Sequence, residues 1–157
     1  MDSDELEGTF VVFGGGTGVF CFLDFVAFTL RYMCNKISLK MFNEENNRIN
    51  NEDFSKVNEN FKLIYFSSFS DEDSAIYIDV CKQLHTLNES YKLNVFNFYS
   101  RISSKDKSWN KTFIENILVK EKNIKKIFLC GPTGFLTDIK NMLLQIDIVS
   151  YKDIHLV

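Results

Sequence analysis

Two glycine-bearing turns, more than a hundred residues apart, carry the strongest chemical signal in this sequence. The first is the segment 14–18 (GGGTG), which follows a short apolar run at 9–13. Glycines let backbone N–H groups approach an anion closely, and the N-terminus of a following helix adds partial positive charge. The turn therefore predicts a seat for a diphosphate. Its spacing is not the G-x-G-x-x-G fingerprint, so a tight strand-to-helix connection without a ligand stays open as the alternative.

The second turn is the segment 130–135 (CGPTGF), which also stands where a strand gives way to a helix. Pro132 is the only proline of the chain, and a proline is tolerated at the start of a helix because its missing N–H costs little there. Gly131 leaves room for a flat ring against the backbone. Taken alone, Cys130 is interpreted as an inert thiol that ends a buried strand.

The two turns gain meaning as a pair. In a doubly wound sheet, ligands bind beyond the carboxyl ends of the strands, at the point where the strand order reverses. If the strands before the two turns flank that point, both turns face one crevice. One turn then binds phosphate and the other binds the reacting ring.

The elements that position these turns alternate regularly along the chain. Strands are expected at 9–13, 62–67, 93–99, 126–130 and 153–157, and helices at about 19–35, 71–90, 112–120 and 133–145. Alternating strands and helices favour parallel pairing with right-handed crossovers. We expect a three-layer α/β fold: a five-stranded parallel sheet in the order 3-2-1-4-5 with helices on both faces. The whole chain, 1–157, forms one domain with a polar insertion at about 43–60.

Composition excludes several classes of function. The net charge of −3 argues against a nucleic-acid-binding surface. The four cysteines and two histidines form no metal-ligand spacing, so we expect free, buried thiols in the cytoplasm or another reducing compartment. The apolar run 10–30 is as long as a membrane span. Its four glycines and Asp24 favour a buried strand, turn and helix instead, so no transmembrane segment is expected.

The paired motifs GGGTGV and CGPTGF resemble the nucleotide-binding domain of the ferredoxin-NADP-reductase superfamily, which includes ferric reductases and the dehydrogenase regions of NADPH oxidases. The segment 22–25 (FLDF) is similar to a PFLDL-like run of some members, and Trp109 falls where many members carry a tryptophan. The resemblance extends from Gly8 to Val157.

The resemblance implies a pyridine-nucleotide site. Cys130 would lie beside the nicotinamide carbon that gives up hydride and would orient the ring without acting as a covalent nucleophile. Ser67 and Ser68 would lie near the adenosine ribose. The implied cofactor-binding residues are Gly15, Gly16, Thr17, Gly18, Ser67, Ser68, Cys130, Gly131, Pro132 and Thr133. The implied cofactor is NADH or NADPH, with FAD held on a missing domain or a partner.

Some positions depart from the family pattern. Cys21 stands where members usually carry a proline after the first turn. No arginine follows the second strand directly, where a 2′-phosphate is often bound, and Arg101 is the nearest candidate. The acidic run 71–73 would repel a 2′-phosphate, so NADH is preferred over NADPH. Nothing before Gly8 could form the flavin-binding barrel of the family.

Two functions follow as hypotheses. The first is an NAD(P)H-binding module that passes hydride to a flavin held by a missing N-terminal region or a flavin-domain protein. The second is a non-catalytic accessory subunit of a larger assembly that retains the reductase fold. For either function, association with a membrane through partners stays open. Among single residues, we expect a buried partner for Asp24, an exposed His85, and a packing role for Trp109.

Overall fold

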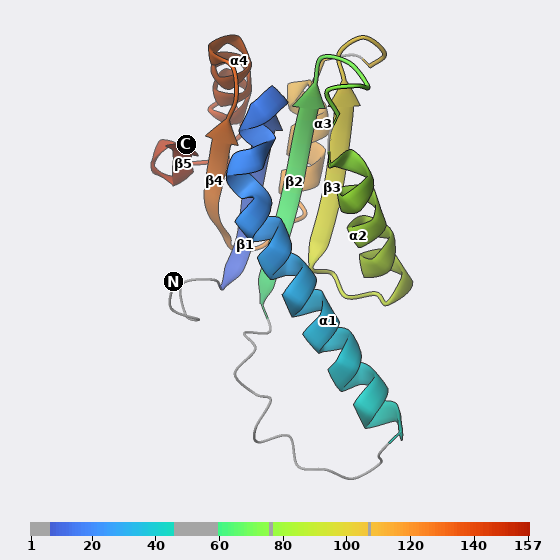
Figure 1. The fold of residues 1–157 in the computed structure, drawn as a ribbon. Helices are drawn as coiled ribbons and strands as arrows, with labels where there is room; N and C mark the ends of the chain where they lie inside the picture. Colours follow the sequence, from blue (N-terminus) through green and yellow to red (C-terminus); the bar gives the residue numbers. More distant parts are fainter. Residues whose placement is uncertain (1–6, 46–59, 76, 107) are drawn as a thin grey trace.

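The computed structural model describes residues 7–45, 60–75, 77–106 and 108–157, without the side chains of 43–45. Five parallel strands form one sheet in the order β3-β2-β1-β4-β5, as predicted (Figure 1). The strands are β1 (Gly8–Gly15), β2 (Phe61–Phe69), β3 (Phe96–Ile102), β4 (Ile124–Cys130) and β5 (Ile154–Leu156).

Helices cover both faces of the sheet. The helical elements are η2 (Gly16–Phe22), α1 (Leu23–Glu45), α2 (Ile78–Ser90), α3 (Lys111–Leu118), α4 (Thr133–Leu143) and η3 (Tyr151–Asp153). One apolar cluster joins the sheet to α1 and α2, and a second joins the opposite face to α3 and α4. Figure 1 shows α1 and α2 on the near face and α3 behind the sheet. The predicted three-layer α/β fold is therefore confirmed.

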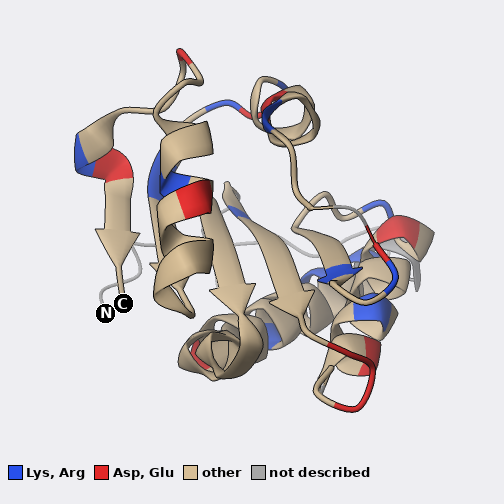
Figure 2. Ribbon diagram, turned by 90° about the horizontal axis from the view of Figure 1, so that it is seen from above, with Lys and Arg blue, Asp and Glu red and all other residues tan. Residues whose placement is uncertain are grey.

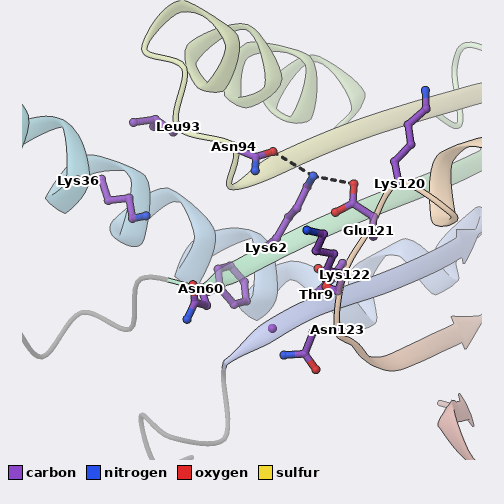
Figure 3. A pocket seen from close by; sticks show the side chains of 12 residues that line it. Thr9, Lys36, Asn60, Lys62, Leu93, Asn94, Lys120, Glu121, Lys122 and Asn123 are labelled. Carbon is purple, nitrogen blue, oxygen red and sulfur yellow. Dashed lines mark hydrogen bonds and ion pairs between the residues drawn. The ribbon is translucent and has the colours of Figure 1, made fainter.

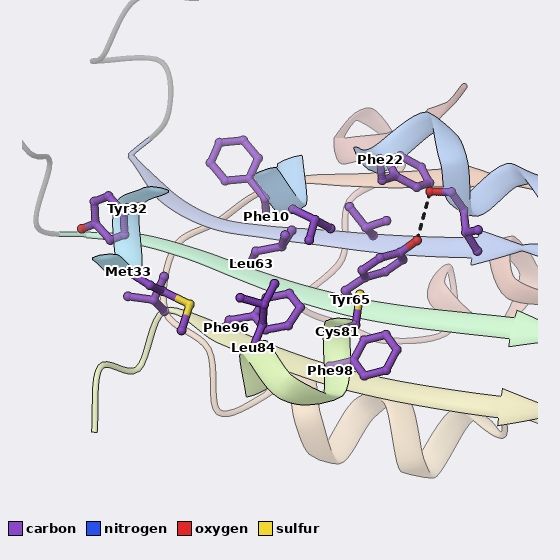
Figure 4. Packing of buried hydrophobic residues seen from close by; sticks show 14 of the residues in the cluster. Phe10, Phe22, Tyr32, Met33, Leu63, Tyr65, Cys81, Leu84, Phe96 and Phe98 are labelled. Carbon is purple, nitrogen blue, oxygen red and sulfur yellow. Dashed lines mark hydrogen bonds between the residues drawn. The ribbon is translucent and has the colours of Figure 1, made fainter. Parts of the chain in front are cut away.

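The central strand β1 is buried along its whole length. Phe10 and Val12 face the α1 side, whereas Val11 and Phe13 face the α3 and α4 side. A strand buried on both faces is apolar at consecutive positions rather than alternating. This explains why the run 9–13 could be recognised in the sequence. Figure 4 shows the cluster on the α1 side, to which β1 contributes Phe10 and β2 contributes Leu63 and Tyr65.

Three predicted elements have bounds that need correction. The strand predicted at 93–99 is β3 at Phe96–Ile102, because Asn94 has a φ of +54° and so interrupts an extended backbone there. The helix predicted to end near Asn35 continues to Glu45 as α1, so residues 43–45 are helical rather than part of a loop. The rest of the predicted polar insertion, 46–59, lies outside the described residues. The helix predicted to begin at Asp71 begins at Ile78.

The acidic run after β2 forms a turn, not a helix start. The Asp71 carboxylate accepts a hydrogen bond from the backbone N–H of Ser74 at 2.8 Å and one from the hydroxyl of Ser70 at 2.7 Å. The Ser70 and Ser74 hydrogen bonds lower the pKa of Asp71. Aspartate side chains that bind their own backbone in this way favour turns over helices.

Expectations for three residues were wrong. Cys21 and Cys34 are exposed, and only Cys81 and Cys130 are buried. Asp24 is exposed, so it needs no buried partner. A helix with apolar residues around most of its circumference can still carry an aspartate on its outer face, and the sequence did not show which face that was.

The helical stretch Gly16–Phe42 is long and apolar enough to cross a membrane by length and composition alone. A core helix of a soluble protein passes the same test. Here Phe22, Val26 and Met33 are buried against the sheet. The structure thus gives this stretch a packing role in the fold.

Candidate nucleotide site

The two glycine-bearing turns lie on neighbouring strands. In the parallel register, Gly14 of β1 pairs with Cys130 of β4, and on the other side Gly15 pairs with Ser68 of β2. The chain runs from β1 to β2 on one side and reaches β4 on the other, so the strand order reverses between β1 and β4. Figure 2 looks down on this edge of the sheet. Both turns therefore lie at the carboxyl ends of neighbouring strands, next to the reversal in strand order.

The turns also touch each other through their backbones. A Cβ at Gly18 would stand 2.5 Å from the carbonyl carbon of Cys130, and a Cβ at Gly131 would stand 3.0 Å from the Cα of Gly15. Real Cβ atoms do not come as close as 2.5 Å, so only glycine fits at position 18. Gly18 therefore lets η2 rest directly on the carboxyl end of β4.

Gly16 differs from the other glycines of the first turn. Its φ is +54°, and a Cβ there would meet nothing within 4 Å. Positive φ is strained for most residues other than glycine. The space in front of Gly16 is therefore open at the point where η2 begins. The residue before that helix is Gly15, so no side chain caps its first backbone N–H groups. Helix α4 also begins without a side-chain cap, at Pro132. Both helix starts thus present backbone N–H groups that an anion could accept from.

A pocket of about 400 Å³ lies at this edge of the sheet. Four predicted residues line it, namely Gly15, Gly16, Ser68 and Pro132. Arg101, which was singled out for a 2′-phosphate, also lines it. The other lining residues were not predicted as part of the site: Phe69, Ser70, Ser103, Phe135 and Asp138. Ser70 and Ser103 follow the ends of β2 and β3, so the rule that sites form beyond strand ends could have found them.

The two predicted serines lie on opposite faces of β2. Ser67 is 1% exposed, and its Oγ has no hydrogen-bond partner among the described residues. Ser68 Oγ accepts a hydrogen bond from Trp109 Nε1 at 2.7 Å. The Trp109 ring also contacts Phe66 edge-on and stacks with Phe113. The packing role predicted for Trp109 is confirmed. A ribose contact by either serine stays a prediction.

Cys130 is 9% exposed, and its thiol donates a hydrogen bond to the sulfur of Cys21 across 3.2 Å. Burial, together with this hydrogen bond, raises the pKa of Cys130 to about 11. The thiol is therefore protonated at neutral pH, and a protonated thiol is a poor nucleophile. This agrees with a role for Cys130 in orienting a ring rather than attacking it.

Tyr65 fixes η2 to the sheet from below. Its hydroxyl donates a hydrogen bond to the backbone carbonyl of Val19 at 3.2 Å, and its ring meets Phe22 edge-on (Figure 4). Burial raises the pKa of Tyr65. The first turn is thus held between Tyr65 of β2 and the backbone of Cys130.

The room next to Gly131 is occupied. A Cβ at Gly131 would come within 2.9 Å of the ring of Phe135, and one at Gly15 within 2.8 Å of the same ring. We expected Gly131 to leave room for the flat ring of a ligand. In the structure, the missing side chain makes room for Phe135 and for the backbone of Gly15.

Comparison with known proteins places the fold. No family model and no curated protein matches the sequence. Solved structures do match at low identity. Flavohemoglobin from Malassezia yamatoensis, with bound FAD and heme, has a TM-score of 0.59 and 15% identity. The CS-b5R domains of human Ncb5or, in the NAD+ form, have a TM-score of 0.59 and 14% identity. A variant of ferredoxin-NADP+ reductase from Plasmodium falciparum, in complex with 2′P-AMP, has a TM-score of 0.56 and 15% identity.

The chain shares its fold with a region of each of these three proteins, one of which is a ferredoxin-NADP+ reductase. The matches cover 100%, 98% and 100% of this chain but 34%, 38% and 56% of the three structures. The chain therefore spans about a third to a little over half of the proteins it resembles. At identities of 14–15%, the likeness establishes the fold only. Which ligand the chain binds has to be argued from the residues of the site.

A larger pocket, of about 570 Å³, lies at the opposite end of the sheet. It is lined at the amino ends of the strands by polar side chains, among them Lys62, Asn94 and Glu121 (Figure 3). Lys62 Nζ donates to Glu121 Oε1 at 2.7 Å and to Asn94 Oδ1 at 3.0 Å. The three side chains satisfy one another's hydrogen-bonding groups, so we interpret them as a structural ion pair with an added amide rather than as a ligand site. The pocket lies at the end of the sheet opposite the glycine turns.

The described residues contain no group of three or more His, Cys, Asp or Glu side chains that could hold a metal ion. His85 is half-buried on α2, with Nδ1 3.4 Å from the backbone carbonyl oxygen of Phe96. The expectation of an exposed His85 was therefore wrong.

Proposed function

We propose that this chain is the NAD(P)H-binding module of a flavin-dependent oxidoreductase, which positions the nicotinamide for hydride transfer to a flavin held elsewhere. The observation that carries the proposal is the open space at Gly16, at the uncapped start of η2, beside the Cys130–Gly131 turn of the neighbouring strand. The ferredoxin-reductase-type fold supports it.

Each part of the edge has a task in this proposal. The backbone N–H groups at the start of η2 bind the pyrophosphate. The pocket beside Ser68, Ser70 and Ser103 receives the adenosine half, and the turn that starts at Cys130 receives the nicotinamide half. When bound, NAD(P)H supplies the hydride and the flavin accepts it. The chain itself binds the dinucleotide, orients its ring and excludes water from one side.

We propose a modest preference for NADH. The acidic turn 71–73 follows Ser70, which lines the pocket, and its three carboxylates are exposed; it is the long red loop in Figure 2. Lys105 pairs with Glu72 at 2.6 Å. Arg101 also lines the pocket and donates to Ser108 Oγ at 3.5 Å. We expect Arg101→Gln to weaken NADPH binding more than NADH binding. Equal weakening of both would remove Arg101 as a contact for a 2′-phosphate.

A second function, a non-catalytic subunit that retains the fold, is favoured by Phe135. Its ring packs against Gly15 and Gly131, where a ligand ring was expected. Phe135→Ala distinguishes the two functions. If the ring restricts the site, the alanine variant binds nucleotide more tightly than the natural chain. If Phe135 only supports the turn, the variant binds more weakly.

Isothermal titration with NADH and NADPH tests the proposal. We expect saturable one-to-one binding of at least one of them below millimolar concentration, with AMP competing for the adenosine half. No heat of binding at millimolar concentrations of either nucleotide would contradict the proposal and favour the accessory subunit. For a chain that does bind, reconstitution with a flavin-domain protein and a spectrophotometric assay tests hydride transfer. We propose that the protein works in a reducing compartment of the cell.

A further inference from the structure

Two thiols meet at the nicotinamide end of the candidate site. Cys21 belongs to η2 and Cys130 ends β4, 109 residues later in the chain. Their sulfur atoms are 3.2 Å apart. This is about 1.2 Å longer than the roughly 2.0 Å of a disulfide bond. The proposed function assigns Cys130 to the ring of the nucleotide and gives Cys21 no task.

The structure fixes this pair from both sides. Gly18 rests on the backbone of Cys130, and the Tyr65 hydroxyl binds the carbonyl of Val19, so η2 is tied to the sheet on either side of the turn. Cys21 lies two residues after Val19 in the same short helix. A pair of thiols held at this separation loses little conformational freedom when it becomes covalently linked.

We propose that Cys21 and Cys130 are an oxidisable dithiol, which a peroxide converts into an intramolecular disulfide that closes the nicotinamide end of the site. In the first step, the Cys21 thiolate attacks the peroxide, breaks its O–O bond, and becomes a sulfenic acid as water leaves. In the second, the Cys130 sulfur attacks the Cys21 sulfur while the Cys130 thiol proton, which already faces Cys21, passes to the departing hydroxyl, so that a second water leaves. Two thiols and one hydrogen peroxide thus give one disulfide and two waters.

The exposures of the two residues assign their roles. Cys21 is exposed and can meet a peroxide from solvent, whereas Cys130 is buried behind it. Cys130 is therefore the resolving thiol, which reacts only after Cys21 has been oxidised. The other two cysteines provide comparisons: Cys34 is exposed on α1, and Cys81, on the buried face of α2, is 1% exposed.

The effect on the nucleotide rests on the proposed function. A bond between η2 and the end of β4 removes the thiol hydrogen of Cys130 and pins the first turn to the second. A nicotinamide ring can then enter between the two turns only if both turns move together. We expect the disulfide to weaken nucleotide affinity about tenfold or more, which corresponds to about 1.4 kcal/mol. Reduction restores the original affinity.

Peptide mapping of the peroxide-treated chain tests the dithiol without any activity measurement. Each cysteine falls in a different tryptic peptide: Cys21 in 1–31, Cys34 in 32–36, Cys81 in 63–82 and Cys130 in 127–140. We expect a non-reduced digest to contain peptide 1–31 linked to peptide 127–140, and the count of free thiols to fall from four to two. The matched control Cys34→Ser forms the same link, and Cys21→Ser does not. Peroxide that drives Cys21 to sulfinic acid without a link, or that links Cys34 or Cys81 instead, overturns the proposal.

Nucleotide titration of the reduced and oxidised chain then tests closure. Weaker binding after peroxide in the natural chain and in Cys34→Ser, reversed by dithiothreitol and missing in Cys21→Ser, supports it. A linked chain with unchanged affinity contradicts closure. If the reduced chain binds neither NADH nor NADPH but the link still forms, the proposed function fails while the dithiol stands, so the two failures are distinguishable.

Discussion

Gly18 lies directly against the backbone of Cys130: a Cβ at position 18 would stand 2.5 Å from both the carbonyl carbon and the carbonyl oxygen. Through this contact, a turn that follows the first strand meets one that follows the fourth. The geometry of the candidate site depends on it, because any side chain at position 18 pushes η2 away from β4.

We expect Gly18→Ala to lower the free energy of unfolding by about 1–3 kcal/mol, as overpacking of a close contact does. Urea denaturation followed by circular dichroism measures it. Gly134→Ala is the matched control: Gly134 lies near the start of α4, and a Cβ there would meet nothing within 4 Å. That control should be neutral or stabilising by up to about 1 kcal/mol. Equal effects of the two changes would show that position 18 is not a close approach.

Gly16 separates backbone strain from ligand contact. Asparagine tolerates positive φ, whereas a β-branched residue is strained there by about 1–3 kcal/mol. We therefore expect Gly16→Asn to keep near-natural stability and Gly16→Val to lose stability. Both side chains fill the open space, so both should weaken nucleotide binding about tenfold or more by titration. Natural affinity in Gly16→Asn would mean that the pyrophosphate does not lie there.

Trp109 and Ser68 form a partly buried hydrogen bond at 2.7 Å. Trp109→Phe keeps an aromatic ring against Phe66 and Phe113 but leaves the Ser68 hydroxyl without this donor. We expect a loss of about 1–2 kcal/mol in unfolding free energy. A double-mutant cycle with Ser68→Ala isolates the bond, and strictly additive effects would show that the two groups do not interact.

Lys62 and Glu121 are only 12% and 11% exposed at their side chains. Removing one partner leaves a nearly buried charge, so Lys62→Met should lower the unfolding free energy by about 1–3 kcal/mol. The double variant Lys62→Met with Glu121→Leu should recover most of that loss. If the double variant is as unstable as the sum of the single ones, the pair is not acting as a coupled unit.

The buried thiol of Cys81 predicts alkaline instability. Burial raises the pKa of Cys81 from 9.0 to about 12. The unfolded chain ionises this thiol first, so the stabilisation is fully present below about pH 9 and is lost as pH rises toward about 12. Denaturation at a series of pH values measures the loss. Cys81→Ala should show a shallower decline over this window, although Cys130 and Tyr65, whose pKa values are also raised, add to the decline in both chains. An unchanged slope would refute the assignment.

The sheet order could be predicted because two independent signals agreed. The run 9–13 is apolar at every position except Thr9, as expected of a central strand, and both glycine turns follow strands. If the two turns share one ligand, they share one edge of the sheet, so the strands at Gly14 and Cys130 were expected to be neighbours. The structure pairs these residues.

Other features were beyond the sequence. The acidic run 71–73 has the charge of a helix start, but the Asp71 carboxylate binds the Ser74 N–H and forms a turn. Local side-chain hydrogen bonds of this kind compete with helix formation, and composition alone does not show whether a turn or a helix forms. The meeting of Cys21 with Cys130 depends on how η2 winds after Gly18, which no spacing rule fixes. The packing of Phe135 on Gly131 is likewise a tertiary contact.

The most direct test is a nucleotide titration of the chain labelled with ¹⁵N-glycine, followed by NMR. The chain has seven glycines, and Gly8 lies at the opposite end of β1 from the turns, so it serves as an internal reference. If a dinucleotide lies across both turns, the signals of Gly15, Gly16, Gly18 and Gly131 shift together on adding NADH or NADPH while that of Gly8 stays in place. Shifts confined to Gly8, or no shifts at millimolar nucleotide, would contradict the account.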